Sequence, residues 1–130
     1  MKSYIIVLLL LFTGTSFLAS AQKSKGDKYF ASYDYRDAID AYQKALKSNA
    51  KDTGILNPLA ACYRILRDYD NAETYYAKAA ASPKATTKIH FYYGQILKNN
   101  GKIDAAKAEF VKCTILDSKD SAAARVRMQK

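Results

Sequence analysis

The side chains suited to covalent or metal chemistry are few in this sequence, and they lie far apart. There is one histidine, His90, and there are two cysteines, Cys62 and Cys113. Nucleophilic catalysis needs a nucleophile next to a general base, and a structural zinc site needs closely spaced Cys and His ligands. Neither spacing occurs here, and no glycine-rich segment has the pattern of a phosphate-binding loop. We therefore expect no enzymatic activity, no metal and no cofactor, and we assign His90 to the core or its boundary.

The two cysteines offer one further chemistry, a disulfide in an oxidising compartment. Cys113 occupies a position where small residues recur along the sequence, whereas Cys62 lies at a different place in the pattern. The two thiols are therefore expected in different layers of the fold. We favour unpaired cysteines, and a disulfide remains the alternative.

The charge of the chain points to anionic partners. Lys and Arg number 21 against 12 Asp and Glu, which gives a formal net charge of +9. Such a balance favours acidic protein segments, envelope polymers or anionic lipid surfaces. Nucleic acid is a less favoured alternative, for which Tyr33, Tyr75 and Tyr92 would be the exposed stacking residues. The basic residues are spread over all faces, so we expect no nucleic acid partner.

Small and aromatic residues recur at a fixed interval of 34 residues. Ala38, Ala72 and Ala106 keep this interval. So do two further sets, the small residues Gly26, Ala60 and Gly94 and the large residues Tyr42, Tyr76 and Phe110. A fixed period of this length is typical of repeat proteins, whose units bury their apolar faces against one another.

Each repeat has the pattern of two helices joined by a short turn. Two apolar-periodic runs of helical length occur in every copy, and no run has the alternation of a strand. The expected turns are 31–34, 66–69 and 99–102, the last of which contains Gly101. The small residues would let the two helices approach closely, and the aromatic residues would fill the space beside that contact. The sequence therefore predicts an all-α fold.

In period and residue types the sequence resembles the tetratricopeptide repeat family. The resemblance implies a right-handed α-solenoid of three helix-turn-helix units, at 19–52, 53–86 and 87–120. The chain departs from the family pattern near the start of each unit, where a tryptophan-like position holds Gln22, Leu56 and His90, and at the closing proline, replaced by Ala50 and Ser118.

The first 21 residues have the features of a secretory signal peptide. Lys2 precedes an apolar run from Tyr4 to Phe12, and small residues Ala19 and Ala21 precede the expected cleavage. An uncleaved anchor is the alternative, but the apolar run is shorter than the roughly 20 residues that span a bilayer. We expect cleavage after Ala21, no membrane span in the mature chain, and a periplasmic or secreted protein, with outer-membrane association as an option.

The ends of the repeat region carry further expectations. Cleavage would leave residues 22–120 as the repeats, trim the first unit, and start its first helix near Ser24. Residues 121–130 are expected to form a short capping helix with Asp120 or Ser121 as N-cap. This edge could be covered by a partner or by a second copy. In unit two we expect Pro58 in the first turn of its helix and Asn57 as N-cap.

The resemblance also implies a peptide groove along the first helix of each unit. Arg64, Lys88 and Lys98 would meet carboxylates, while Phe30, Ile65 and Phe91 would offer apolar contact. Ordinary solvated residues on a helical face are the alternative. The implied groove residues are Lys23, Asp27, Phe30, Asn57, Ala61, Arg64, Ile65, Lys88, Phe91, Gln95, Lys98 and Asn99.

A carboxylate clamp used by some relatives provides a stricter comparison. Its lysine, asparagine, asparagine, lysine and arginine positions hold Lys23, Asp27, Pro58, Lys88 and Tyr92 here, so only the two lysines agree. The chain has a weaker likeness to the N-terminal repeat segment of Gram-negative OmpA-like envelope proteins. Together these features favour a non-catalytic envelope module that binds an acidic or mixed apolar–acidic protein segment. A structural subunit that assembles through its convex face or C-terminal edge is the alternative, and a polyanion binder is less favoured.

Overall fold

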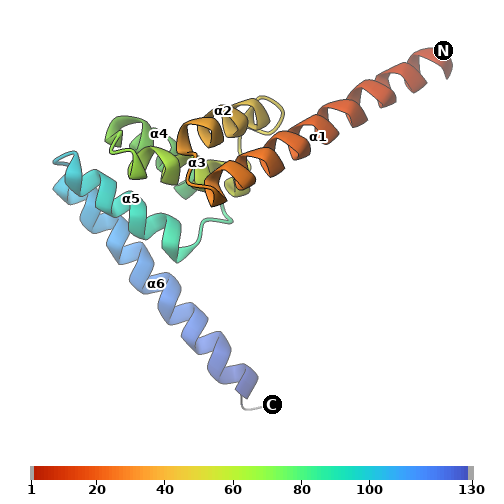
Figure 1. Ribbon diagram of the computed structural model, residues 1–130. Helices are drawn as coiled ribbons and strands as arrows, with labels where there is room; N and C mark the ends of the chain where they lie inside the picture. Colours follow the sequence, from red (N-terminus) through yellow and green to blue (C-terminus); the bar gives the residue numbers. More distant parts are fainter. Residues whose placement is uncertain (1, 129–130) are drawn as a thin grey trace.

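The chain folds into helices stacked in pairs (Figure 1). The computed structural model describes the backbone of residues 2–128 and the side chains of residues 16–120. Within the described residues there is no strand, which confirms the predicted all-α class. The helices are α1 (Lys2–Ala31), α2 (Tyr35–Leu46), α3 (Thr53–Ile65), α4 (Tyr69–Ala80), α5 (Thr87–Asn99) and α6 (Ile103–Met128).

Helix contacts follow the chain order of a solenoid. Helices α1 and α2, α3 and α4, and α5 and α6 form pairs, while α2 packs on α3 and α4 packs on α5. The N-terminal part of α1 and the C-terminal part of α6 extend past the helices between them (Figure 1). Between residues 16 and 120, where the structure describes the side chains, no helical segment combines the length and apolarity needed to cross a bilayer.

The turn within each pair repeats one backbone geometry. Tyr33, Arg67 and Gly101 all have positive φ, at 65°, 61° and 77°. The residue that follows each of these donates its backbone N–H to the carbonyl oxygen of the residue five positions earlier. This bond closes the preceding helix in a Schellman-type motif. Only Gly101 adopts this conformation without a Cβ penalty. The bonds are Asp34 to Tyr29, Asp68 to Tyr63 and Lys102 to Leu97, at 2.9, 2.9 and 2.8 Å.

The repeated small residues let the helices of a pair touch. A Cβ on Gly26 would lie 2.6 Å from the Tyr42 ring, and one on Gly94 would lie 2.7 Å from the Phe110 ring. Tyr42 and Tyr76 are 1% and 0% exposed, so each ring fills the centre of its pair. Burial of a side chain of this size stabilises a fold by about 1.5–3 kcal/mol. The predicted close approach is therefore confirmed.

Helix α3 begins earlier than expected. The Asp52 carboxylate accepts the Gly54 N–H at 2.8 Å, which makes Asp52 the N-cap. Asn57 and Pro58 therefore lie inside the helix, and the prediction that Asn57 caps it is wrong. Capping by Asp52 secures the first turn, so the helix continues through Pro58 despite the hydrogen bond that proline cannot donate.

Both terminal segments continue helices of the repeats. Helix α6 runs from Ile103 to Met128, so Asp120 and Ser121 lie in its interior and cap no separate helix. The predicted C-terminal cover is instead a continuation of α6, because no turn-forming glycine or proline interrupts it. Residues 129 and 130 lie outside the described residues. At the other end, α1 passes through Gly14 and Ala21 without a break, and the expected cleavage stays a prediction.

Candidate functional site

The groove residues implied by the sequence all have access to solvent. They come from α1, α3 and α5, the first helices of the units, and we call this set of residues the first-helix face. None of them belongs to the buried core. Asp27, Ile65, Lys88, Phe91, Gln95, Lys98 and Asn99 are exposed, while Lys23, Phe30, Asn57, Ala61 and Arg64 are half-buried.

In the first unit, the charges of this face neutralise each other. The Lys23 ammonium contacts the Asp27 carboxylate at 2.8 Å, and the Tyr42 hydroxyl donates to the other Asp27 oxygen at 2.7 Å. Burial raises the pKa of Tyr42 well above its usual value, and the hydrogen bond and charge of Asp27 raise it further. Tyr42 therefore stays a neutral donor, and this end of the face holds a satisfied carboxylate.

In the second and third units, two cations meet at one aromatic ring. The Arg64 guanidinium lies 4.2 Å from the centre of the Tyr92 ring, and the Lys88 ammonium lies 6.0 Å from it. Arg64 Nε also donates to the Tyr76 hydroxyl at 3.3 Å. Burial raises the pKa of Tyr76, although the bond to Arg64 opposes the rise. Neither Arg64 nor Lys88 has an ion-pair partner among the described side chains.

This arrangement suits recognition of a carboxylate. Contacts between a cation and a ring hold the guanidinium in place, and each contributes about 0.5–2 kcal/mol. With Nε already bonded to Tyr76, the terminal nitrogens of Arg64 are left as donors for a planar anion. Lys88 adds a second positive charge close by.

Apolar side chains lie on the same face. Phe91 and Ile65 are 43% and 38% exposed. The centre of the Phe91 ring lies 5.5 Å from the centre of the Tyr92 ring and 6.1 Å from that of the Phe110 ring. The position of Phe91 is therefore fixed from two sides. The Phe30 ring packs against the Tyr35 ring in an edge-to-face contact, with 5.5 Å between the ring centres. The face thus offers both charged and apolar contacts.

Sequence reasoning missed the role or the burial of three tyrosines. Tyr76 was expected only to fill space, whereas its hydroxyl also anchors Arg64. Tyr92 and Tyr75 were expected to be exposed, but they are half-buried, because Tyr92 lies beneath Arg64 and Tyr75 stacks on Tyr63 at 5.5 Å. Tyr33 is 78% exposed, as expected.

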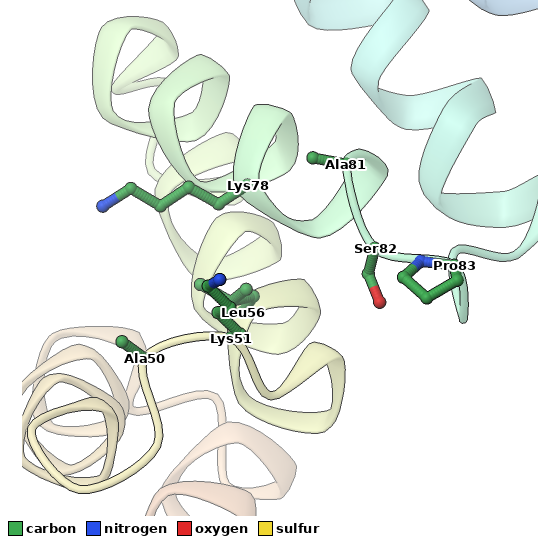
Figure 2. A pocket seen from close by; sticks show the side chains of 7 residues that line it. All are labelled: Ala50, Lys51, Leu56, Lys78, Ala81, Ser82 and Pro83. Carbon is green, nitrogen blue, oxygen red and sulfur yellow. The ribbon is translucent and has the colours of Figure 1, made fainter.

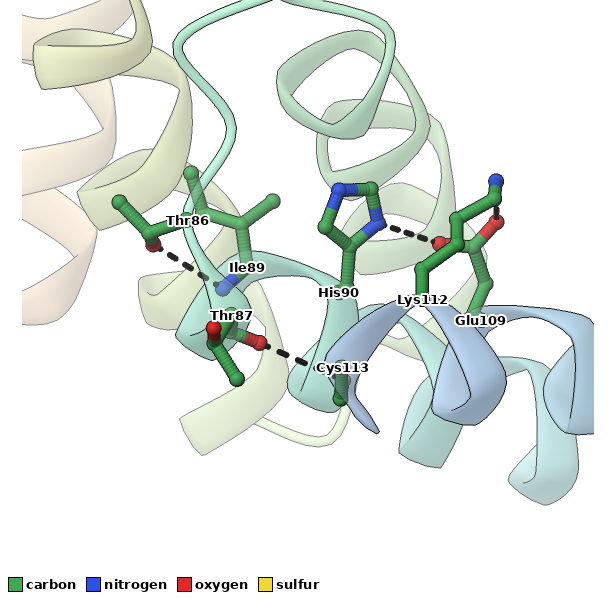
Figure 3. A network of polar contacts seen from close by, with 7 residues as sticks. All are labelled: Thr86, Thr87, Ile89, His90, Glu109, Lys112 and Cys113. Atoms are coloured by element: carbon green, nitrogen blue, oxygen red, sulfur yellow. Dashed lines mark hydrogen bonds and ion pairs between the residues drawn. The ribbon is translucent and has the colours of Figure 1, made fainter. Parts of the chain in front are cut away.

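His90 takes part in a buried polar network between α5 and α6. Its ring faces Glu109 (Figure 3). The His90 Nδ1 atom lies 2.7 Å from a carboxylate oxygen of Glu109. Lys112 contacts the other oxygen of Glu109 at 2.6 Å. His90 and Glu109 are 7% and 6% exposed, which confirms the predicted core or boundary position. The histidine is oriented toward α6 and connects the two helices.

The cysteines are free thiols and both are buried. Burial raises the pKa of Cys62 to about 12, so its reactive thiolate is suppressed. Cys113 donates to the Thr87 carbonyl at 3.5 Å (Figure 3). In the part of the chain that the structure describes, no three potential metal-ligating side chains converge.

Comparison with known proteins gives a consistent match. Residues 55–84 and 87–120 match the family model described as tetratricopeptide repeat. Protein unc-45 homolog B of Xenopus laevis is 35% identical over 101 residues, which are 75% of this chain and 11% of that protein. The chain therefore spans about a tenth of the length of this curated relative.

Solved structures agree with the observed helix arrangement. The first TPR of Spaghetti (RPAP3), bound to HSP90 peptide SRMEEVD, has a TM-score of 0.72 and 27% identity and covers 79% of this chain and 82% of its own. The crystal structure of MamA has a TM-score of 0.75 at 23% identity, over 83% of this chain and 63% of its own. The second likeness concerns the fold alone.

Proposed function

The chain carries tetratricopeptide repeats, a protein–protein interaction module, and from this premise we propose that its first-helix face binds an acidic or mixed apolar–acidic segment of a partner protein. The protein acts without catalysis, as an adaptor. The observation that carries the proposal is the pair of cations, Arg64 and Lys88, at the ring of Tyr92.

The electrostatics of the face favour a bound carboxylate. Like charges held near one ring repel each other, and an anion placed between them relieves that repulsion. Lys98, which is exposed on the same helix as Lys88, extends the positive region along α5. The exposed parts of Ile65 and Phe91 would contact apolar side chains of the same segment.

The similar structure with a bound peptide supports the ligand class and not its identity. The peptide SRMEEVD carries carboxylates beside apolar residues. In this chain, however, Asp27, Pro58 and Tyr92 occupy clamp positions that would otherwise hold asparagine or arginine. Asp27 already occupies the Lys23 ammonium and the Tyr42 hydroxyl, so neither group is left to bind a terminal carboxylate. We therefore infer an acidic segment that binds nearer to units two and three.

The setting of the proposed adaptor is the cell envelope. Residues 1–21 have the composition of a secretory signal, and cleavage after Ala21 would release a periplasmic or secreted chain. The acidic segment would then belong to an exported protein or to an envelope complex.

Binding can be tested with an array of seven-residue peptides in which Asp or Glu alternates with apolar residues. Each peptide has a partner with Asn or Gln in place of the acids. We expect the full chain to prefer the acidic member, and a Lys88→Glu/Lys98→Glu variant to bind that member more weakly. Lys25→Glu/Lys28→Glu makes the same charge change on α1 and serves as the control. Equal binding of acidic and amide peptides would refute the proposal.

A second function is favoured by the outer surface of α6. Val111 and Ile115, one turn apart, are 57% and 48% exposed, and Ile103 is 46% exposed. A structural subunit that assembles through this edge would retain its partner in the Lys88→Glu/Lys98→Glu variant and lose it on Val111→Lys.

A further inference from the structure

A second groove lies away from the first-helix face, where the helix pairs are joined. Its larger part has a volume of about 520 Å³ and is bordered by Ala50 and Lys51 in the α2–α3 linker, by Leu56, by Lys78 of α4 and by Pro83 (Figure 2). An adjoining hollow of about 410 Å³ shares Ala50 and Lys78 with it. We call the two together the linker groove.

The floor of the linker groove is apolar. Leu56 is 1% exposed and belongs to the core formed by α3, α4 and α5. In the smaller hollow, Leu46 and Tyr75 line the wall and pack against that same core. An occupant that inserts an apolar side chain would therefore continue the core of the repeat stack.

The rim of the groove is positively charged. Lys47, Lys51 and Lys78 line the two hollows, and neither hollow is lined by an Asp or Glu. All three lysines are exposed, and none has an ion-pair partner among the described side chains. Lys78 instead lies with its ammonium 5.2 Å from the centre of the Tyr75 ring. The groove thus combines an apolar floor with unneutralised positive charge.

We propose that the linker groove is a second docking site, for an acidic segment of a partner protein that places an apolar side chain over Leu56 and carboxylates beside Lys47, Lys51 and Lys78. Complementary charge would speed association and fix the register of the segment, while the apolar contact supplies affinity. None of the residues that line it belongs to the predicted first-helix groove, so the two sites can be occupied independently.

Two other anionic partners fit the groove less well. Single-stranded nucleic acid needs free aromatic faces for stacking, whereas Tyr75 is stacked on Tyr63 and also lies beneath Lys78. A bilayer presents a broad surface that cannot enter a recess whose floor is Leu56. A short protein segment can both enter the recess and reach the lysines.

The test uses the full chain and a defined probe, the labelled peptide Gly-Glu-Glu-Leu-Glu-Glu-Gly. Its controls replace every Glu by Gln, or the Leu by Ser. Nuclear magnetic resonance titration should shift the backbone signals of Ala50, Ala81 and Ser82, and both control peptides should bind more weakly. Signals that move only on α1, α3 and α5, or no movement at all, would overturn the proposal.

Matched variants separate the site from general charge attraction. Lys51→Glu/Lys78→Glu should weaken probe binding at least about tenfold, because attraction at the rim becomes repulsion. Lys107→Glu/Lys119→Glu makes the same change in net charge on α6 and should have little effect. The proposal fails if both variants weaken binding equally.

Other occupants are distinguished by two further measurements on the same variants. Sedimentation analysis that shows a dimer of the unaltered chain, lost in Lys51→Glu/Lys78→Glu, would assign the groove to a second copy and overturn a partner segment. Binding to phosphatidylglycerol vesicles that depends on these lysines, together with no binding of the peptide probe, would assign it to lipid. Monomeric protein with peptide binding supports the proposal as stated.

Discussion

Tyr42 and Tyr76 occupy the same position of successive repeats, yet their hydroxyl groups have partners of opposite charge. Both rings are fully buried between the helices of their pair. The Tyr42 hydroxyl donates to Asp27, whereas the Tyr76 hydroxyl accepts from Arg64. The same scaffold position therefore supports a carboxylate in unit one and a guanidinium in unit two.

The difference shows how a repeat protein varies recognition without changing its core. In unit one, Lys23 also contacts Asp27, so the charges are satisfied within the chain. In unit two, Arg64 is held by a neutral hydroxyl and an aromatic ring, which leave its positive charge uncompensated. On the first-helix face, the charged groups of unit one are thus paired with each other. Arg64 and Lys88, at the boundary of units two and three, can still bind an anion.

The largest expected effect comes from breaking the scaffold that both tyrosines share. Gly26→Val would place carbon atoms against the Tyr42 ring, since even a Cβ would lie 2.6 Å from it. Displacement of the ring should also separate its hydroxyl from Asp27. We expect a loss of about 1–3 kcal/mol in the free energy of unfolding, measured by urea denaturation followed by circular dichroism.

A matched control isolates this packing effect. Ser24→Val adds a β-branched side chain at an exposed position of the same helix and should change stability much less. If the two variants were equally stable, the close approach at Gly26 would not contribute to the fold.

The next largest effects come from removing the hydroxyl group of Tyr42 or of Tyr76, and they should distinguish the two residues. Tyr42→Phe and Tyr76→Phe should each reduce the free energy of unfolding by about 1 kcal/mol, because a hydrogen bond is lost while the ring remains. Only Tyr76→Phe should weaken the binding of acidic peptides, since it releases Arg64 Nε. Fluorescence anisotropy with paired acidic and amide peptides measures this. Equal loss of binding in both variants would contradict the assignment of the site to Arg64.

The period of the sequence was sufficient to predict the scaffold. Gly26 and Tyr42 recur in kind at fixed spacing, and their contact needs no information beyond one helix pair. The start of α3 was harder to predict than the scaffold, because Asp52 and Asn57 are both good capping residues. Pro58 favoured a helix that starts after Asn57. In the structure, the Gly54 N–H donates to the Asp52 carboxylate, so the helix starts after Asp52.

The candidate site was predicted only in part. A helical pattern indicates that Arg64 and Lys88 point to solvent, but not that they meet at Tyr92. That contact depends on how α3 and α5 are placed relative to each other. The linker groove likewise depends on how the α2–α3 linker, the α4–α5 linker and α4 are placed relative to one another. A local sequence pattern does not indicate this placement.

The smallest expected effect concerns another carboxylate, Glu73, which like Asp27 is neutralised within the chain. Its oxygens accept from Lys102 and Asn100 of the next unit. Hydrogen bonds from these two side chains hold the pKa of Glu73 below its ordinary value of 4.5. A lowered folded-state pKa contributes stability that is present above the unfolded value and is lost as pH falls through the folded value.

We therefore expect Glu73→Gln to lower the melting temperature at pH 7 and to have a diminishing effect below pH 4.5. The change should be smaller than those at Gly26 and Tyr76, because Lys102 is exposed and water screens the pair. Thermal melts at several pH values measure it, with Asp117→Asn as a control at an exposed carboxylate. A difference that stays constant with pH would mean that the Glu73 charge does not stabilise the boundary between units two and three. Asp27 would then differ from Glu73 in that the Tyr42 hydroxyl supplies it with a buried donor that Glu73 lacks.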